Sequence, residues 1–306
     1  MEPAFLFGTV GNPLSTPPKP GGTIGGIQRI RELGLEALEL AWVRSVRVSE
    51  ATCRQIREAA AAGVALSVHA PYFINLNAQD RAGYKASKDR LMAAARAGYQ
   101  AGAQDIVFHP GAYQGARPER AYETVRRRLQ EIVEELRAEG VAVTLRPETM
   151  GKSALFGTLE EVIQLARDVP GVLPCIDFAH LHARAGNGSF NSYEEFARAL
   201  QQVAAGLGPR GLETLHIHLS GIAYTRKGER HHLVLQEADL RYEELLQALI
   251  DLGGRGRILC ESPNLEEDAL LLQATYRRLL ERRAPAPLPK KSLPPALSGA
   301  QGEGPR

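Results

Sequence analysis

Apolar positions along the chain follow two alternating patterns. Short apolar runs of the kind that form buried strands recur from the start of the chain to about residue 263. Between them, longer stretches carry apolar residues at helical spacing, as in residues 23–34, 119–140 and 240–254, which predicts amphipathic helices. The eight predicted strands are FLFGTV (5–10), ALELAWV (37–43), VALSVHAPY (64–72), DIVFHPG (105–111), VAVTLRPE (141–148), VLPCIDFAH (172–180), ETLHIHLS (213–220) and RILCESP (257–263).

This alternation predicts an α/β fold, a (β/α)8 TIM barrel. An open parallel sheet is the alternative, but the glycine-rich segment 11–26 after the first strand matches neither GxGxxG nor a Walker loop. The segments TLEE (158–161) and NSYEE (191–195) predict helix starts with capping boxes. We expect one barrel domain over residues 1–283 and a disordered tail, rich in proline, glycine and serine, over residues 284–306.

The composition is typical of a globular protein, with 44% hydrophobic and 24% charged residues. A net charge of +2 does not by itself indicate a nucleic-acid partner, although it leaves room for a local basic face. The three cysteines, Cys53, Cys175 and Cys260, include no CxxC pair, which argues against a disulfide framework and fits a reducing compartment. No segment has the layout of a signal peptide or the length of a membrane span, so we expect a cytoplasmic protein.

The histidines carry the first sign of chemistry. Each one falls at the end of a predicted strand or in the segment after it, and none falls on a predicted helix. They are His69, His109, His180, His182, His216, His218, His231 and His232. In a TIM barrel the carboxyl ends of the strands and the loops after them meet on one face, where active sites are built. Any one of these histidines alone would more often be a structural hydrogen-bonding residue, and the role of His182 stays open.

Four carboxylates, Glu148, Asp177, Glu229 and Glu261, occupy equivalent places along the chain. An ionised carboxylate after an apolar strand is costly unless it is paired, and four around one opening would repel each other. Bound cations would remove this penalty. Imidazole and carboxylate ligands together suit zinc or manganese, so the sequence predicts a metal site at the carboxyl-terminal face.

The two-residue alternation of side chains along a strand indicates which histidines face the metal site. His216 and His218 share one side of their strand, and His218 lies nearer the carboxyl-terminal mouth, so His218 is the predicted ligand and His216 a core residue. In an extended segment Glu229 and His231 would share a side as well. His232 would then point the other way, so we expect it to lie outside the site.

The motifs resemble a known family. VHAPYFINL, VFHPGAY, PETMG, CIDFAH, HIHLSG, GERHHL and ESPN occur in the order seen in the endonuclease IV family of apurinic/apyrimidinic endonucleases, over residues 5–280. The resemblance implies a TIM barrel with three zinc ions. It also implies a monomer that hydrolyses the phosphodiester on the 5′ side of an abasic site in double-stranded DNA, as in base excision repair.

The resemblance further implies three zinc sites that share ligands. The first consists of His69, His109 and the bridging Glu148. The second consists of Glu148, Asp177, His218 and Glu261. The third consists of His180, Glu229 and His231. Manganese in place of zinc at one site is compatible with the same ligands.

Catalytic and DNA-contacting residues follow from the same resemblance. Closely spaced ions lower the pKa of a bound water. Glu148 is expected to orient this water or accept its proton, and Glu261 is the second expected catalytic residue. Displacing a nucleotide requires an apolar or aromatic wedge, which Tyr72 and Phe73 would provide. The expected DNA contacts are Tyr72, Phe73, Trp42 and Arg44.

Three departures from the family pattern indicate a divergent branch. Ser220 and Gly221 replace an amide and a carboxylate, Glu229 stands where many members have Asp, and LVLQEADL (233–240) lacks a typical GEG. A metal-dependent sugar isomerase or epimerase of the xylose-isomerase-like barrels is the alternative enzyme. A barrel that recognises damaged DNA without hydrolysing it is the alternative that is not an enzyme.

Overall fold

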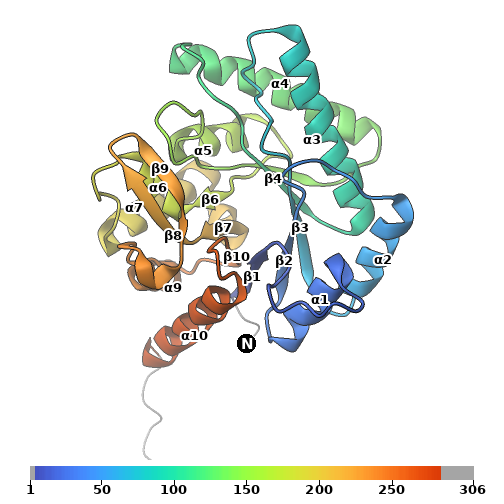
Figure 1. Cartoon of the computed structure of the whole chain (residues 1–306). Coiled ribbons are helices and arrows are strands. Elements are labelled where there is room, and N and C mark those ends of the chain that lie inside the picture. Colours follow the sequence, from blue (N-terminus) through green and yellow to red (C-terminus); the bar gives the residue numbers. More distant parts are fainter. Residues whose placement is uncertain (1–3, 284–306) are drawn as a thin grey trace, which may run out of the picture.

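The computed structural model describes residues 4–283, which form a barrel of parallel strands with helices around it (Figure 1). The eight barrel strands are β1 (Phe5–Val10), β2 (Ala37–Ala41), β3 (Ala65–His69), β4 (Asp105–Phe108), β5 (Thr144–Pro147), β6 (Ile176–Asp177), β7 (Leu215–Leu219) and β10 (Gly256–Cys260). The predicted disordered tail, residues 284–306, lies outside the described residues.

Strand pairing closes the barrel. The strands pair in the order β5-β4-β3-β2-β1-β10-β7-β6, and the parallel bridges Leu145–Val172 and Glu148–Cys175 join β5 to the segment that leads into β6. A hydrogen bond of 3.0 Å from the Cys175 amide to the Pro147 carbonyl continues this contact. The predicted (β/α)8 barrel is therefore confirmed, and the open-sheet alternative is wrong.

Amphipathic helices cover the barrel, and their apolar faces are buried against the strands. They are α1 (Gly22–Glu32), α2 (Glu50–Ala60), α3 (Arg81–Ala101), α4 (Pro118–Ala138), α5 (Leu159–Asp168), α6 (Phe178–Arg184), α7 (Tyr193–Leu207), α8 (Arg210–Glu213), α9 (Tyr242–Asp251) and α10 (Glu266–Arg283), with a 3-10 turn at Leu235–Glu237. The predicted helix starts are confirmed: Thr158 forms a full capping box with Glu161, and the Ser192 side chain accepts the Glu195 amide. Among the described helices, none is both long and apolar enough to cross a membrane.

A β-hairpin that the sequence pattern did not predict follows β7. It consists of β8 (Gly221–Thr225) and β9 (Gly228–Leu233), paired antiparallel. Gly228 has a φ of 93°, and a Cβ on it would lie 2.4 Å from the Gly151 carbonyl oxygen. The Glu229 amide donates to that same oxygen at 2.9 Å. This close contact fixes the hairpin against the loop after β5, at the carboxyl-terminal end of the barrel.

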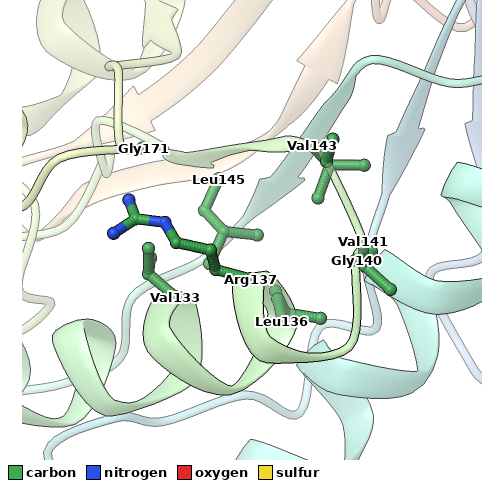
Figure 2. A pocket seen from close by; sticks show the side chains of 9 residues that line it. Val133, Leu136, Arg137, Gly140, Val141, Val143, Leu145 and Gly171 are labelled. Atoms are coloured by element: carbon green, nitrogen blue, oxygen red, sulfur yellow. The ribbon is translucent and has the colours of Figure 1, made fainter.

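An apolar hollow of about 220 Å³ lies at the opposite end, between the end of α4 and the start of β5 (Figure 2). Val133, Leu136 and Val143 contribute to its lining, and Arg137 is its charged residue. The Arg137 guanidinium donates to the Pro170 carbonyl at 3.4 Å. The hollow therefore brings no group of titratable side chains together, unlike the carboxyl-terminal mouth.

Candidate metal centre

The carboxyl ends of the barrel strands bring the predicted ligands together. Five of them, His69, His109, His180, Glu229 and Glu261, border a cavity of about 280 Å³ at the mouth of the barrel. His69 ends β3, Asp177 ends β6, and His218 lies one residue before the end of β7. His109 and Glu148 each follow their strand directly, after β4 and β5, and Glu261 directly follows β10.

Glu148 lies at the middle of this group and is fully buried. Its Oε2 lies 3.2 Å from Nε2 of His69 and 3.2 Å from Nε2 of His109. Its Oε1 lies 3.2 Å from Nδ1 of His180 and 3.4 Å from Nδ1 of His218. One carboxylate thus faces four imidazoles, two on each oxygen, which suits a bridging ligand.

Several buried atoms of this group have no hydrogen-bond partner within the described part of the chain. They are Oε1 of Glu148, Oδ2 of Asp177, and both ring nitrogens of His218. Buried polar atoms are nearly always paired, so orphans at a strand end call for an explanation. Two ligands on one tetrahedral zinc lie about 3.3 Å apart, given bonds of about 2.0–2.1 Å. The separations of the Glu148 oxygens from Nε2 of His69 and His109 and from Nδ1 of His218, 3.2–3.4 Å, match the edges of such a polyhedron.

Backbone carbonyls fix the tautomers of three histidines. Nδ1 lies 2.9 Å from the Ala70 carbonyl oxygen in His69 and 2.9 Å from the Thr149 carbonyl oxygen in His180. In His232, Nδ1 lies 3.1 Å from the carbonyl oxygen of Glu261. A carbonyl can only accept, so each Nδ1 carries the proton and each Nε2 keeps a lone pair for a metal ion.

The electrostatics of the mouth favour protons or cations. Burial raises the pKa of Asp177 to about 6, and the charges of Glu148 and Glu261 contribute to this rise, against the lowering effect of His180 and His232. Burial opposes the charged form of His180 too, yet neighbouring carboxylates raise its pKa well above its usual value. The carboxylates favour the protonated imidazoles, and the imidazolium charges favour the ionised carboxylates. Binding of divalent ions would replace the protons of this group.

Three groups of side chains at the mouth have ligand atoms close enough to hold a metal ion, and a fourth group, Glu39–His69–His218, extends from the mouth into the barrel. The three at the mouth are His69–His109–Glu148, Glu148–Asp177–His218–Glu261 and Asp177–His180–His232. The first two coincide with ligand sets expected from the sequence. In the third, His232 occupies the place expected for His231. Glu229 approaches this third group, with Oε2 3.6 Å from Nε2 of His180.

The expectation that Glu229 and His231 share a side is wrong for this structure. On β9, Glu229 pairs with Tyr224 while His231 pairs with Ala223, so Arg230 is an extra residue in a β-bulge. A bulge shifts the side-chain alternation by one position. As a result His231 is exposed to solvent, and His232 points into the cavity together with Glu229.

A short helix corrects a second expectation, that no histidine lies on a helix. Helix α6 begins directly after Asp177, whose side chain accepts the His180 amide at 2.7 Å. Both His180 and His182 lie on it. Only the first turns into the centre: His182 is hydrogen-bonded by Nδ1 to the Ser189 carbonyl and by Nε2 to Asp239, both at 2.9 Å. The open role of His182 is thus that of a structural residue.

Sequence reasoning missed one carboxylate in the barrel, Glu39 on β2. It is fully buried, with Oε2 2.9 Å from Nε2 of His216 and Oε1 2.9 Å from Nε2 of His218. The placement of His216 below the mouth agrees with its prediction as a core residue, and burial lowers the pKa of its imidazole to about 4. A charged residue between Leu38 and Leu40 in an apolar strand was the signal that could have revealed Glu39.

Of the expected DNA-contacting residues, Tyr72 lines the cavity at this mouth. The Tyr72 ring stacks on His109, with ring centroids 5.2 Å apart, and its side chain is half exposed. Phe73 is 65% exposed, and its carbonyl oxygen accepts a hydrogen bond from Arg90 at 3.1 Å. The Tyr72 amide donates to the Val43 carbonyl at 2.9 Å, which places the loop with Trp42 and Arg44 beside Tyr72. Arg44 is exposed and Trp42 is half-buried.

The departures from the family pattern have structural roles of their own. Ser220 is fully buried, and its hydroxyl has no hydrogen-bond partner among the residues described. Gly221 begins β8, where a Cβ would lie 2.5 Å from the Val234 carbonyl oxygen. The hairpin can therefore leave β7 at this point only because residue 221 has no side chain.

Comparison with known proteins agrees with this architecture. A family model described as xylose isomerase-like TIM barrel matches residues 27–281. The chain belongs to this family. A relative from Methanocaldococcus jannaschii, the uncharacterized protein MJ0133, is 37% identical over 278 residues, which cover 91% of this chain and 99% of that protein.

Endonuclease IV proteins are among the relatives, which confirms the resemblance of the motifs. A probable endonuclease 4 of Shouchella clausii is 30% identical over 173 residues, covering 54% of this chain and 56% of that protein. The crystal structure of endonuclease IV from Thermus thermophilus has a TM-score of 0.66 and 25% identity, covering 90% of this chain and 99% of that one. These modest identities fit a divergent branch. A D-tagatose 3-epimerase-like structure, with a TM-score of 0.65, 22% identity and coverage of 84% and 93%, shares the fold.

Proposed function

We propose that this chain is a metal-dependent endonuclease that hydrolyses the phosphodiester on the 5′ side of abasic sites in double-stranded DNA. Zinc is the ion that we propose, at up to three positions. The observation that carries the proposal is Glu148, a fully buried carboxylate whose two oxygens face four imidazoles at 3.2–3.4 Å. The similarity of the chain to endonuclease IV of Thermus thermophilus supports the choice of an abasic-site substrate.

The proposed ligands follow the geometry of the mouth. They are His69, His109, Glu148, Asp177, His180, His218, Glu229, His232 and Glu261. Such a histidine-rich set with several carboxylates suits zinc better than calcium or magnesium, which prefer oxygen ligands alone. The carboxylate-rich second group is the one that manganese would also accept.

Bound divalent ions would supply an activated water and positive charge against the phosphate. Glu148 reaches both sides of the cluster, and its proposed role is to hold the ligands in register and orient the attacking water. Glu261 lines the cavity and is the second proposed catalytic residue. Lys152 lines the same cavity and can bring an ammonium group to the phosphate. Tyr72 and Phe73 offer exposed aromatic faces to an unstacked nucleotide.

Incision of a duplex oligonucleotide carrying one tetrahydrofuran abasic analogue tests the proposal. The analogue cannot undergo β-elimination, so cleavage on its 5′ side reports hydrolysis. We expect cleavage by metal-replete protein, loss after treatment with a chelator, and recovery on addition of zinc. Bound ions are counted on the same samples.

A variant pair controls this experiment. Glu148→Gln should reduce incision by more than about a hundredfold, since even residues behind a ligand cost about 10–100-fold. Glu58→Gln, an equivalent change at an exposed position on α2, should leave incision unchanged. Fully metallated wild-type protein that leaves the strand intact would refute the endonuclease. Epimerisation of a ketose by that protein would then favour the sugar-isomerase alternative, which rests on the shared fold.

A further inference from the structure

We propose that Glu39 is a positioning residue of the metal centre: it accepts the Nε2 proton of His218 and so fixes the ring with Nδ1 facing the ions. The inference rests on the metal centre of the proposed function and concerns a residue outside its ligand set. Glu39 lies on β2, across the barrel from the β7 strand that carries His218. Its role is separate from direct coordination.

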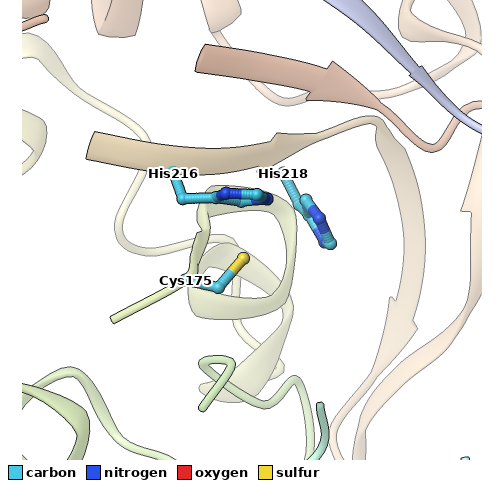
Figure 3. A group of neighbouring side chains, drawn as sticks. All are labelled: Cys175, His216 and His218. Atoms are coloured by element: carbon cyan, nitrogen blue, oxygen red, sulfur yellow. The ribbon is translucent and has the colours of Figure 1, made fainter. Parts of the chain in front are cut away.

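A polar layer lies in the barrel interior around Glu39. Such layers in TIM barrels are usually filled by branched apolar side chains. Here Glu39, Ser67, Cys175 and His216 are all fully buried. Figure 3 shows His216 and His218 side by side on β7, with the Cys175 sulfur directed toward them. Burying so many polar groups is costly, so their pairing needs a purpose beyond core packing.

Two donors hold the Glu39 carboxylate. The Ser67 hydroxyl donates to Oε2 at 2.6 Å, and Nε2 of His216 donates to the same oxygen at 2.9 Å. A carboxylate can only accept, so His216 carries its proton on Nε2. Both anchors act on one oxygen. The other, Oε1, is left for His218.

His218 completes the chain of contacts. Its Nε2 lies 2.9 Å from Oε1 of Glu39, and neither atom has a hydrogen-bond partner elsewhere or at the present angle among the described residues, so each is free to pair with the other. A carboxylate can only accept, so the proton belongs on Nε2. Nδ1 then keeps its lone pair, 3.4 Å from Oε1 of Glu148 and 3.5 Å from Oε1 of Glu261. This carboxylate–histidine order fixes the tautomer and makes the ring a stronger ligand.

The Cys175 thiol lies next to His216 and His218, and its state bears on whether these residues bind a metal ion of their own. Cys175, His216 and His218 also have ligand atoms close together. A thiol must lose its proton to coordinate, and Cys175 is fully buried. His216 already uses Nε2 on Glu39. Glu39 is therefore better placed to orient His218 than this group is to bind a metal ion of its own.

Metal affinity, measured without reference to nuclease activity, tests the role of Glu39. Zinc binding to metal-free protein is titrated in competition with a chromophoric chelator at fixed pH, for wild type, Glu39→Leu and Glu39→Gln. We expect Glu39→Leu to weaken the tightest step by about 10–100-fold while the number of ions at saturation stays the same. Glu39→Gln keeps an acceptor oxygen and should restore most of the affinity. Ser67→Ala removes one anchor of Glu39 and should give a smaller loss.

Unfolding of the metal-free variants separates positioning from packing. If Glu39→Leu lowers stability but binds zinc as tightly as wild type, the role is structural and the proposal fails. If either Glu39 variant loses one ion at saturation, Glu39 is itself a ligand, which also overturns the proposal. Cobalt-loaded protein provides a further test. A thiolate-to-cobalt absorption that vanishes in Cys175→Ser would also overturn the proposal, because the group of Cys175, His216 and His218 would then bind the ion. If wild type binds zinc without cutting DNA and Glu39→Leu still loses affinity, the result supports Glu39 and refutes only the endonuclease.

Discussion

The two ends of the barrel both bury charged side chains, but among the described residues the carboxyl-terminal end leaves several of their polar atoms without a hydrogen-bond partner. At the amino-terminal end, Oδ1 of Asp105 lies 2.5 Å from Nε of Arg146, and Oδ2 lies 2.9 Å from Nη2 of Arg257. At the carboxyl-terminal end, Oε1 of Glu148 and Oδ2 of Asp177 are buried without a hydrogen-bond partner among residues 4–283. A buried charge that is fully paired can belong to the scaffold, whereas an unpaired one needs a ligand.

Two buried aspartates show the same difference in their ionisation. Burial alone would raise the pKa of Asp105, but the charges of Arg146 and Arg257 outweigh it and lower the pKa below its usual value. Burial raises the pKa of Asp177 to about 6, and nearby carboxylates contribute to the effect. Asp105 therefore gains stability from being ionised in the fold, and Asp177 loses stability until a cation arrives.

The largest predicted effect comes from removing the charge at the paired end. Asp105→Asn leaves two buried guanidinium groups without their carboxylate, and we expect the free energy of unfolding to fall by about 3–5 kcal/mol. Asp177→Asn is the matched change at the other end. In metal-free protein at neutral pH it should leave stability unchanged or raise it. Urea unfolding of both variants makes the comparison, and equal losses would contradict it.

The acid limb of stability gives an independent reading of Asp105. Its folded pKa is lowered, so its contribution is fully present above the unfolded value of about 3.9 and is lost as pH falls through the folded pKa. Wild type should therefore lose stability more steeply than Asp105→Asn below about pH 4. Parallel curves for the two proteins would show that the arginine pairs contribute nothing to folding.

An intermediate effect on metal affinity should distinguish His231 from His232, at the carboxyl-terminal end of the barrel. His232 points into the cavity and should be a ligand, so His232→Ala should weaken the third metal step by about tenfold or more. His231 is exposed, and His231→Ala should bind metal like wild type. Metal titration of the two variants tests this assignment. A loss confined to His231→Ala would restore the ligand set expected from the sequence.

The positions of the proposed strand-end ligands could be predicted from the sequence because chain order fixes them. In a parallel barrel every strand ends at the same face, so an apolar run followed by His or Asp places that side chain at the mouth. His69, His109, Glu148, Asp177 and Glu261 need no other information. The fold itself followed from the same alternation of strands and helices.

Two features of the site could not be predicted from the sequence, the place of His232 and the role of Glu39. They depend on local geometry and on contacts across the barrel. One extra residue, Arg230, shifts the alternation on β9 and exchanges His231 for His232. Period-two reasoning contains no signal for such a bulge. The role of Glu39 depends on contacts with His216 and His218, 177 residues or more away in the chain, which no local pattern reports.

The smallest predicted effect concerns Phe73, which follows Tyr72 at the carboxyl-terminal end of the barrel and is 65% exposed. An exposed apolar ring that stacks on an unstacked nucleotide contributes about 1 kcal/mol or somewhat more, about fivefold in affinity. Phe73→Ala in a Glu148→Gln background, which prevents incision, should therefore bind an abasic duplex about fivefold more weakly. Leu280, 39% exposed near the end of α10, provides the control: Leu280→Ala removes an exposed apolar side chain outside the loops that follow the strands and should change nothing. Fluorescence anisotropy with abasic and intact duplexes measures both variants. A loss that is equal for the two duplexes, or equal for the two variants, would mean that Phe73 contributes general surface contact rather than recognition of the displaced nucleotide.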